Sequence, residues 1–222
     1  MNKNKTNINW DSLWEKRKDL DWWRTPAKDF VKILESLDFS GQEKFYDLGA
    51  GIGRHTVLLA KAGFDVYASD DSQAAIDQIE EWLAKEKVSA KTYLCDMAEG
   101  PFEKDFFDFV VSYNVIYHGQ QERMQQAIDH VYDILKPNGY FYFTCPSIKD
   151  GRCGSGTEVG YQAWRCENAL DKGEVHCFTT REDLDKYLEK FEIVSVNLNE
   201  GSFVHEGKDR FYSDWQVLVK KK

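Results

Sequence analysis

The segment 45–56 constrains the fold of this chain most strongly, because an apolar, strand-like run passes there into a glycine-rich loop and then into a helix. The three alternating glycines are Gly49, Gly51 and Gly53. Glycine at this spacing lets the backbone turn tightly and lets a ligand approach the main chain without meeting a Cβ atom. A dinucleotide-binding G-x-G-x-x-G motif would need glycine at 54, beside a pyrophosphate, where this chain has Arg54. The loop therefore predicts a nucleoside ligand without a pyrophosphate.

Length and composition indicate one globular domain that does not bind nucleic acid. The 222 residues suffice for one buried α/β core with an insertion and are few for two full domains. Hydrophobic residues make up 42% of the chain, which is typical of a globular protein and excludes a disordered one. Lys and Arg number 29 against 38 Asp and Glu, and the resulting net charge of −9 repels phosphate backbones.

The N-terminal residues and the cysteines predict a cytoplasmic protein. Residues 1–8 are polar and lack the apolar core of a signal peptide. No apolar run approaches the roughly 18 residues that span a bilayer, so we expect no membrane partner. The five cysteines are odd in number and form no C-x-x-C pair. We therefore expect reduced thiols and no metal site.

Helix and strand patterns alternate along residues 25–145. The predicted strands cover 44–48, 64–69, 88–95, 107–113 and 140–145. The predicted helices begin at the Thr25-Pro26 pair, at Arg54 and at Ser72, and a fourth covers 121–136. Such alternation requires right-handed crossovers and a parallel sheet that helices cover on both faces.

The last third of the chain departs from this alternation. Residues 146–178 are rich in glycine and show no strong periodicity, which is typical of a lid or binding loop. A capping box at 179–182 predicts a helix that continues to about residue 190. Residues 191–197 and 211–220 then predict two strands, which we expect to form an antiparallel pair at the sheet edge.

Carboxylates follow two of the predicted strands, at the sheet edge where open α/β proteins bind ligands. Asp70 and Asp71 end the second strand, and a carboxylate there can accept hydrogen bonds from both ribose hydroxyls. The alternative is that they only help Ser72 to cap the next helix. Asp96 follows the third strand and could accept from an adenine amine while Met97 packs on the ring. The alternative there is an ordinary loop aspartate.

The fourth strand is followed by Asn114, Tyr117 and His118. His118 is either a general base or a structural histidine in a turn.

Taken together, these motifs resemble the class I S-adenosylmethionine-dependent methyltransferases. Residues 47–53 are similar to the first motif of that family, Asp70 to its ribose-binding acid, and 95–97 to its adenine-side motif. Residues 107–114 are similar to its fourth strand and 135–140 to its turn into the fifth.

The resemblance implies an α/β, Rossmann-like doubly wound fold: a mostly parallel seven-stranded sheet with an antiparallel edge strand and a lid insertion. We expect a single domain over residues 1–222. Its expected parts are an N-terminal helical lid (1–40), a cofactor-binding core (41–145), a lid or substrate insertion (146–178), and a C-terminal helix with edge strands (179–222).

The resemblance also implies that S-adenosyl-L-methionine is the cofactor and S-adenosyl-L-homocysteine the product. The residues expected to bind the cofactor are Asp47, Gly49, Ala50, Gly51, Gly53, Asp70, Asp71, Asp96, Met97 and Asn114.

Within the family, the chain is most similar to small-molecule methyltransferases of the tellurite-resistance type, on residues 54–56 and 176–182. This implies direct in-line methyl transfer to an oxygen, nitrogen, sulfur or chalcogen acceptor, in a monomer or homodimer. Tyr117 and His118 are the catalytic candidates. The residues expected to contact the acceptor are Trp22, Trp23, Arg24, Trp164 and His176.

Two other function classes stay open from the sequence. A sensor that binds S-adenosylmethionine without turnover would keep the glycine loop and Asp70 but would lack an acceptor pocket. A nicotinamide-dependent oxidoreductase is disfavoured by Arg54.

Overall fold

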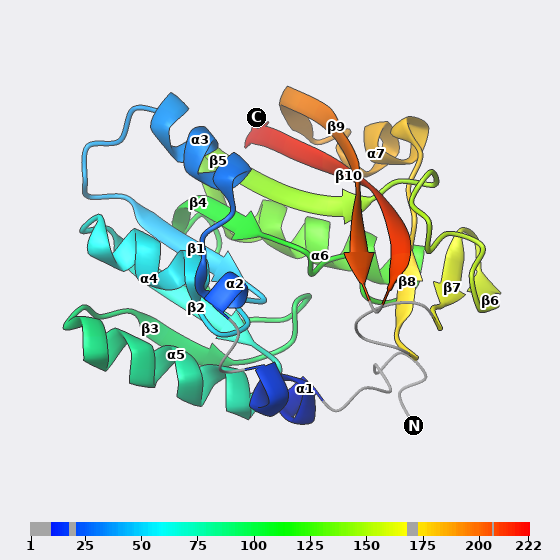
Figure 1. The fold of residues 1–222 in the computed structure, drawn as a ribbon. Helices are drawn as coiled ribbons and strands as arrows, with labels where there is room; N and C mark the ends of the chain where they lie inside the picture. Colours follow the sequence, from blue (N-terminus) through cyan, green and yellow to red (C-terminus); the bar gives the residue numbers. More distant parts are fainter. Residues whose placement is uncertain (1–9, 18–20, 168–172, 206) are drawn as a thin grey trace.

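The computed structural model describes residues 10–17, 21–167, 173–205 and 207–222. Within these residues a central seven-stranded sheet has the order β3-β2-β1-β4-β5-β10-β9 (Figure 1). Its strands are β1 (Lys44–Leu48), β2 (Asp65–Asp70), β3 (Lys91–Leu94), β4 (Phe107–Ser112), β5 (Leu135–Pro146), β9 (Phe191–His205) and β10 (Lys208–Lys221). Strands β1 to β5 pair in parallel, and β10 pairs antiparallel with both β5 and β9. The predicted mostly parallel sheet with an antiparallel pair at one edge is confirmed.

Helices cover both faces of the sheet, as the β-α alternation requires. On one face lie α3 (Lys28–Ser36), α4 (Arg54–Lys61) and α5 (Gln73–Glu86), and on the other lie α6 (Gln121–Ile134) and α7 (Arg181–Tyr187). Side chains alternate along a strand, so β1 serves both layers. Phe45 packs with α3 and α4, whereas Tyr46 and Leu48 pack with α6.

The N-terminal helices α1 (Trp10–Arg17) and α2 (Asp21–Arg24) lie beside the carboxyl ends of the first strands (Figure 1). Asp11 fixes α1 to the start of α5, since its carboxylate accepts hydrogen bonds from the Ser72 hydroxyl at 2.6 Å and the Ala74 amide at 3.0 Å. The prediction of a helical lid over 1–40 falls partly on residues 1–9 and 18–20, which lie outside the described residues.

Residues 146–178 contain regular structure that the sequence did not indicate. Strands β6 (Thr157–Gly160), β7 (Ala163–Arg165) and β8 (Val175–Cys177) form a small antiparallel sheet in the described part of this insertion. A backbone bridge between His118 and His176 joins it to the segment after β4. The sequence did not indicate these strands, because strands of three or four residues are too short to leave a pattern. The role of the insertion as a lid stays a prediction.

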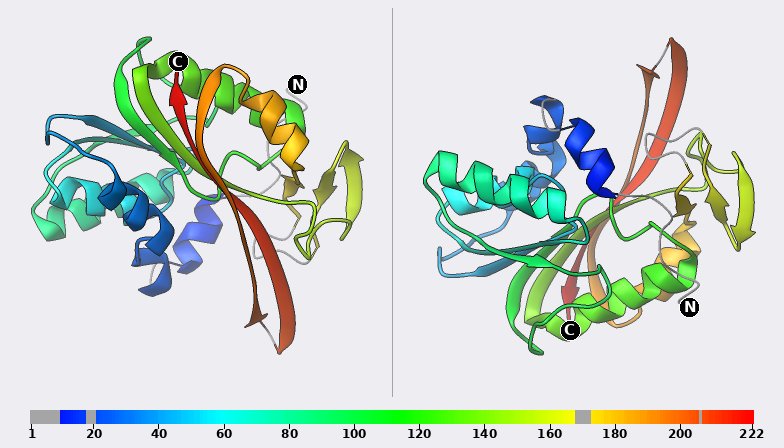
Figure 2. Two further views of the ribbon diagram at one scale, coloured as in Figure 1. Left: turned by 90° about the horizontal axis from the view of Figure 1, so that it is seen from above. Right: turned by 90° about the horizontal axis from the view of Figure 1, so that it is seen from below.

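The hairpin of β9 and β10 is much longer than predicted. The two strands pair from Phe191 with Lys221 out to His205 with Lys208, and the tip extends past the ends of the other strands (Figure 2). The prediction ended the first strand at 197 and began the second at 211. Residues 198–210 lack clear alternation in the sequence, and cross-strand hydrogen bonds extend the hairpin through 198–205 and 208–210.

Several element ends also differ from the prediction. Helix α3 begins at Lys28 rather than at Pro26, and the Ala27 amide at its start donates to His55 Nε2 at 3.2 Å instead of to a threonine cap. The capping box lies one residue later than expected, on Thr180 and Asp183, and α7 ends at Tyr187. Strand β3 is shorter than 88–95. Helix α6 ends at Ile134, and β5 begins at once.

Candidate functional site

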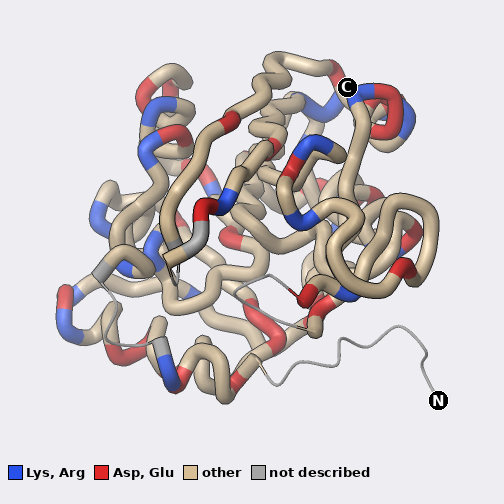
Figure 3. Tube along the Cα trace, turned by 45° about the vertical axis from the view of Figure 1, so that its right-hand side comes forward, with Lys and Arg blue, Asp and Glu red and all other residues tan. Residues whose placement is uncertain are grey.

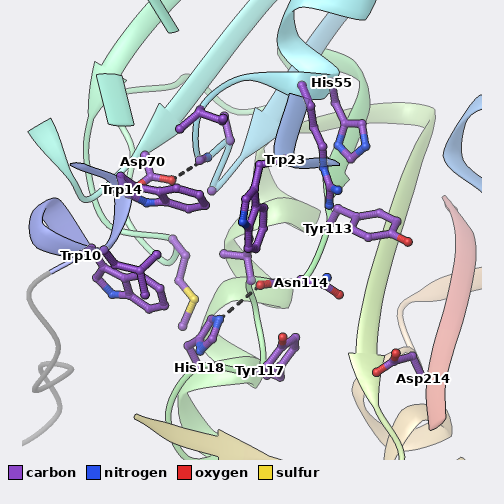
Figure 4. A pocket seen from close by; sticks show the side chains of 18 of the residues that line it. Trp10, Trp14, Trp23, His55, Asp70, Tyr113, Asn114, Tyr117, His118 and Asp214 are labelled. Carbon is purple, nitrogen blue, oxygen red and sulfur yellow. Dashed lines mark hydrogen bonds between the residues drawn. The ribbon is translucent and has the colours of Figure 1, made fainter. Parts of the chain in front are cut away.

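A cavity of about 1100 Å³ opens at the carboxyl ends of β1, β2, β3 and β4 (Figure 4). The sheet order changes direction between β1 and β4, and open α/β sheets bind ligands at such a switch point. Residues of α1 and α2 line one side of the cavity, and residues of the β9–β10 hairpin line another. The cavity is therefore enclosed by parts of the chain that are far apart in sequence.

The glycine loop after β1 forms the floor of this cavity. At two of its glycines, neighbouring side chains leave no room for a Cβ atom. Gly49 and Gly51 have φ angles of 71° and 56°, in the left-handed region that favours glycine. A Cβ atom would lie 2.4 Å from the Val115 side chain at Gly49 and 2.8 Å from the Trp14 ring at Gly51. Any side chain at these positions would displace the walls of the cavity.

Asp70, at the end of β2, is bonded to this loop through its side chain. Its Oδ2 accepts from the Gly51 amide at 2.8 Å, and its Oδ1 accepts from the Ser72 amide at 3.1 Å (Figure 4). A carboxylate offers about four acceptor positions, so two remain for a ligand in the cavity. Burial raises the pKa of Asp70 to about 7, with the nearby carboxylates of Asp71 and Asp47 acting in the same direction.

Asp47 and Arg54 lie at the two ends of the loop and interact electrostatically. Asp47 is buried, its Oδ2 accepts from the Thr56 hydroxyl at 2.6 Å, and burial raises its pKa to about 6. The guanidinium of Arg54 lies 4.8 Å from the centre of the Tyr113 ring and 5.9 Å from that of Trp23. Burial lowers the pKa of Arg54, but a guanidinium stays charged. The site thus presents a fixed cation beside the loop.

The residues predicted to lie beside an adenine ring follow the end of β3. The Asp96 carboxylate forms an ion pair with Arg123 and accepts from the Ala98 amide at 2.7 Å. Met97 lines the cavity, and so does Leu94, whose side chain is 55% exposed. An exposed leucine beside a methionine offers an apolar surface for a flat ring.

The segment after β4 is held by hydrogen bonds to Thr144 on β5 and to its own backbone. Asn114 has φ 62°, its amide donates to Thr144 Oγ1 at 2.9 Å, and that hydroxyl donates to Asn114 Oδ1 at 3.0 Å. His118 Nε2 lies 3.2 Å from the Asn114 carbonyl oxygen (Figure 4). Because a carbonyl only accepts, Nε2 carries the proton. The His118 ring packs against Trp10 and Tyr117, with ring centres 5.0 and 4.6 Å away.

Most of the residues predicted from the sequence come together in this cavity, although no bound ligand tests their roles. The predicted residues that line it are Asp47, Gly49, Ala50, Gly51, Asp70, Asp71, Asp96, Met97, Asn114, Tyr117, His118, Trp22 and Trp23.

The remaining predicted residues lie elsewhere in the structure. Gly53 starts α4 with φ 90° and packs against Ile79. Arg24 lies over the Trp82 ring at 4.8 Å, and Trp164 packs on Phe178. His176 is buried, with its ring 4.9 Å from that of His118. The predicted contact of Arg24, Trp164 and His176 with an acceptor stays a prediction.

Sequence reasoning missed the contribution of the hairpin, and it assigned residues 146–178 to a lid or substrate insertion without naming Arg152. The additional lining residues used below are Arg152, Phe203, Phe211, Tyr212 and Asp214. Arg152 donates from Nε and Nη2 to the two Asp150 oxygens at 2.8 and 3.1 Å. The only signal in the sequence was the density of aromatic and charged residues in 203–215.

Lys and Arg are interspersed with Asp and Glu along the trace in Figure 3. None of the helices in the described residues has the length and apolar character needed to cross a bilayer. In the same part of the chain, no three His, Cys, Asp or Glu side chains gather as a metal site would require.

Comparison with known proteins finds a family model that matches part of this chain. Residues 45–139 match the family model described as a methyltransferase domain. Two curated proteins are each 30% identical to this chain over 108 residues, or 49% of its length. They are Hemagglutinin 1 of Eikenella corrodens and TehB of Haemophilus influenzae, named a probable S-adenosyl-L-methionine-dependent methyltransferase. The alignments cover 36% and 37% of those proteins, so this chain spans about a third of the curated relatives it matches.

Solved structures share the fold over most of the chain. TehB from Haemophilus influenzae superposes with a TM-score of 0.68 at 22% identity, covering 89% of this chain and 63% of that one. A 1,6-didemethyltoxoflavin-N1-methyltransferase from Burkholderia thailandensis, with bound 1,6-didemethyltoxoflavin and S-adenosylhomocysteine, superposes with a TM-score of 0.66 at 15% identity. That alignment covers 95% of this chain and 84% of the other. At these identities the likeness establishes the common fold.

Replacing Asp70 by alanine should weaken the binding of S-adenosylhomocysteine. The change removes charge-assisted hydrogen bonds, each worth about 1.5–3 kcal/mol, so we expect a roughly 10- to 150-fold higher Kd by calorimetry. Asp77→Ala, at an exposed position on α5, is the matched control and should bind as the unchanged protein does. Equal affinity in Asp70→Ala and the control would contradict the assigned role.

The raised pKa of Asp70 predicts a pH dependence for nucleoside binding. Ribose hydroxyls donate to the ionised carboxylate, so affinity should rise with pH through about 7, by roughly tenfold between pH 6 and pH 8. The probe is 5′-methylthioadenosine, which has no group that titrates in this range. In Asp70→Asn the Kd should be higher and nearly constant with pH. A flat profile for the unchanged protein would contradict the prediction.

Proposed function

We propose that the protein is a class I S-adenosylmethionine-dependent methyltransferase that methylates a small molecule. The match of residues 45–139 to the methyltransferase-domain model and the 30% identity to TehB over 108 residues support this proposal. The transfer is a direct in-line displacement from S-adenosylmethionine to an oxygen, nitrogen, sulfur or heavier chalcogen atom. The matched relatives are longer than this chain, and the activity is therefore proposed for the residues present here.

One observation carries this proposal: a single cavity extends from the glycine loop and Asp70 to the hairpin residues beyond Tyr113. Its volume of about 1100 Å³ is at the upper end of the range for small-molecule sites. Such a cavity has room for a cofactor and a small acceptor together. A sensor would need only the part beside the loop.

The residues beside the loop fit S-adenosylmethionine in their chemistry. The open acceptor positions on Asp70 suit the two ribose hydroxyls, and the apolar Leu94 and Met97 suit the adenine ring. Arg54 supplies a cation for the carboxylate of the methionine part. When bound, the cofactor supplies a methyl group on a positively charged sulfur.

The chain itself contributes positioning and the exclusion of water. Helices α1 and α2 and the β9–β10 hairpin line the cavity on sides that the parallel sheet leaves open. Holding two reactants in line can supply about 7–11 kcal/mol of the barrier at the upper limit. Trp22 and Trp23 would line the space that the acceptor occupies. Tyr117 and His118 would lie beside the reacting atoms.

A small-molecule acceptor is supported by the shape and charge of the site. The net charge of −9 disfavours nucleic acid. The Burkholderia thailandensis neighbour, which has the same fold, holds a small heterocyclic molecule beside S-adenosylhomocysteine. We place the reaction in the cytoplasm, in a monomer or homodimer.

Incubation with methyl-labelled S-adenosylmethionine tests the proposal. The acceptor panel contains thiols, amines, phenols, ring N–H compounds, selenite and tellurite, and label should pass to at least one class with release of S-adenosylhomocysteine. Asp70→Ala at limiting cofactor is the matched negative control. Binding of S-adenosylhomocysteine without any transfer would favour a sensor. Tight binding of NADH together with no binding of S-adenosylhomocysteine would overturn the assignment of S-adenosylmethionine as the cofactor.

A further inference from the structure

The carboxylates that line the cavity differ in how far their oxygens are already used. Most of them accept hydrogen bonds from the backbone, from hydroxyls or from arginine; these are Asp11, Asp47, Asp70, Asp96 and Asp150. Asp214, on β10, accepts no hydrogen bond from the described residues. Its nearest charged partner is Arg152 Nη2 at 3.8 Å, which is beyond hydrogen-bond distance. Both oxygens of Asp214 are therefore available to a ligand.

Asp214 points into the cavity, and its side chain is 25% exposed (Figure 4). The charged and titratable groups around it are Arg152 and Asp150 in the segment after β5, Asp29 on α3 and Tyr113 after β4. Burial raises the pKa of Asp214 to about 6, and the cation of Arg152 opposes that rise. A carboxylate of this pKa is mostly ionised at neutral pH and is a stronger base than an ordinary surface aspartate.

The side of the cavity formed by α2 and the hairpin is aromatic. Trp22, Phe203 and Phe211 line it although they are 52%, 47% and 46% exposed. Large rings left open around a cavity mark a surface that a ligand covers. Tyr117 and Tyr212 line the same cavity. Rings from three separate segments suit a flat molecule better than a compact oxyanion.

His118 is the other base to consider, and its protonated nitrogen already donates to the Asn114 carbonyl. Its ring is 9% exposed and is enclosed by Trp10, Tyr117 and His176. Those contacts fit a residue that holds the segment after β4 in place. Asp214 is the more exposed of the two and is not held by such packing.

From these observations we infer that Asp214 is the general base of the proposed methyl transfer, and that the acceptor is an aromatic molecule whose attacking oxygen or nitrogen carries a proton. This inference rests on the proposed function. The acceptor's O–H or N–H bond breaks, and its proton moves to a carboxylate oxygen of Asp214. The freed electron pair forms the bond to the methyl carbon as the carbon–sulfur bond breaks and returns its pair to sulfur. The products are neutral S-adenosylhomocysteine, methylated acceptor and protonated Asp214.

The test compares acceptors that do and do not need a base. The probes are phenol and 4-chlorophenol, which are protonated at pH 7.5, 4-nitrophenol, which is largely ionised, and the ring N–H compounds benzimidazole and lumazine. Asp214→Asn should lower kcat/KM about 100-fold for protonated acceptors and much less for 4-nitrophenol. In Asp214→Asn, the rise of kcat/KM through about pH 6 should also disappear.

Asp77→Asn is the matched control, because it makes the same charge change at an exposed position on α5 that does not line the cavity. Its kcat/KM and pH profile should equal those of the unchanged protein. All variants should bind S-adenosylhomocysteine with unchanged Kd, which shows that they fold. A readout independent of turnover is the carboxyl ¹³C titration: the signal missing in Asp214→Asn should titrate near pH 6.

Four outcomes overturn the inference. The first is transfer to 2-mercaptoethanol, selenite or tellurite but to no aromatic probe. The second is an equal loss of kcat/KM for phenol and 4-nitrophenol in Asp214→Asn. The third is an unchanged pH profile in Asp214→Asn, and the fourth is loss of the rise near pH 6 in His118→Gln instead. In each of them methyl transfer continues, so the proposed function survives. Binding of S-adenosylhomocysteine with no transfer to any compound overturns both.

Discussion

The buried carboxylate of Asp70 is the interaction on which the cofactor side of this protein depends. One oxygen binds the Gly51 amide and the other binds the Ser72 amide, so the end of β2, the glycine loop and the start of α5 share one acceptor. The Ser72 hydroxyl donates in turn to Asp11 and links α1 to the same point. Because burial raises the pKa of Asp70 to about 7, the charge of the carboxylate that joins these elements changes near neutral pH.

The two sides of the cavity are built in different ways. On the cofactor side, short loops at the carboxyl ends of parallel strands fix glycines and carboxylates by backbone hydrogen bonds. On the opposite side, the long β9–β10 hairpin and the N-terminal helices supply aromatic rings, many of them open to solvent. The rigid side suits a ligand common to a family, and the open side suits an acceptor particular to this chain.

The fold could be predicted from the sequence because its determinants are local. Each element leaves its own mark in the sequence. The spacing of apolar residues identifies the helices and strands, the glycines before Arg54 identify the loop after the first strand, and an acid marks the end of the second strand. Placement of Asp70 and Asn114 at strand ends followed directly. The antiparallel pair was predicted but its full length was not, because residues 198–205 show no alternation and are placed by pairing with 208–215 on the other strand. Asp214 was missed for the same reason: its place in the cavity depends on that pairing and on the neighbouring β5.

A crystal structure with S-adenosylhomocysteine bound tests the central claim most directly, namely that one cavity holds the cofactor at the glycine loop and the acceptor beside the hairpin. The account predicts both ribose hydroxyls within hydrogen-bond distance of Asp70. It also predicts that the ligand's sulfur faces open space lined by Tyr113, Tyr117 and Asp214. A ligand bound away from Asp70, or a sulfur that faces a closed wall with no room for an acceptor, would contradict it.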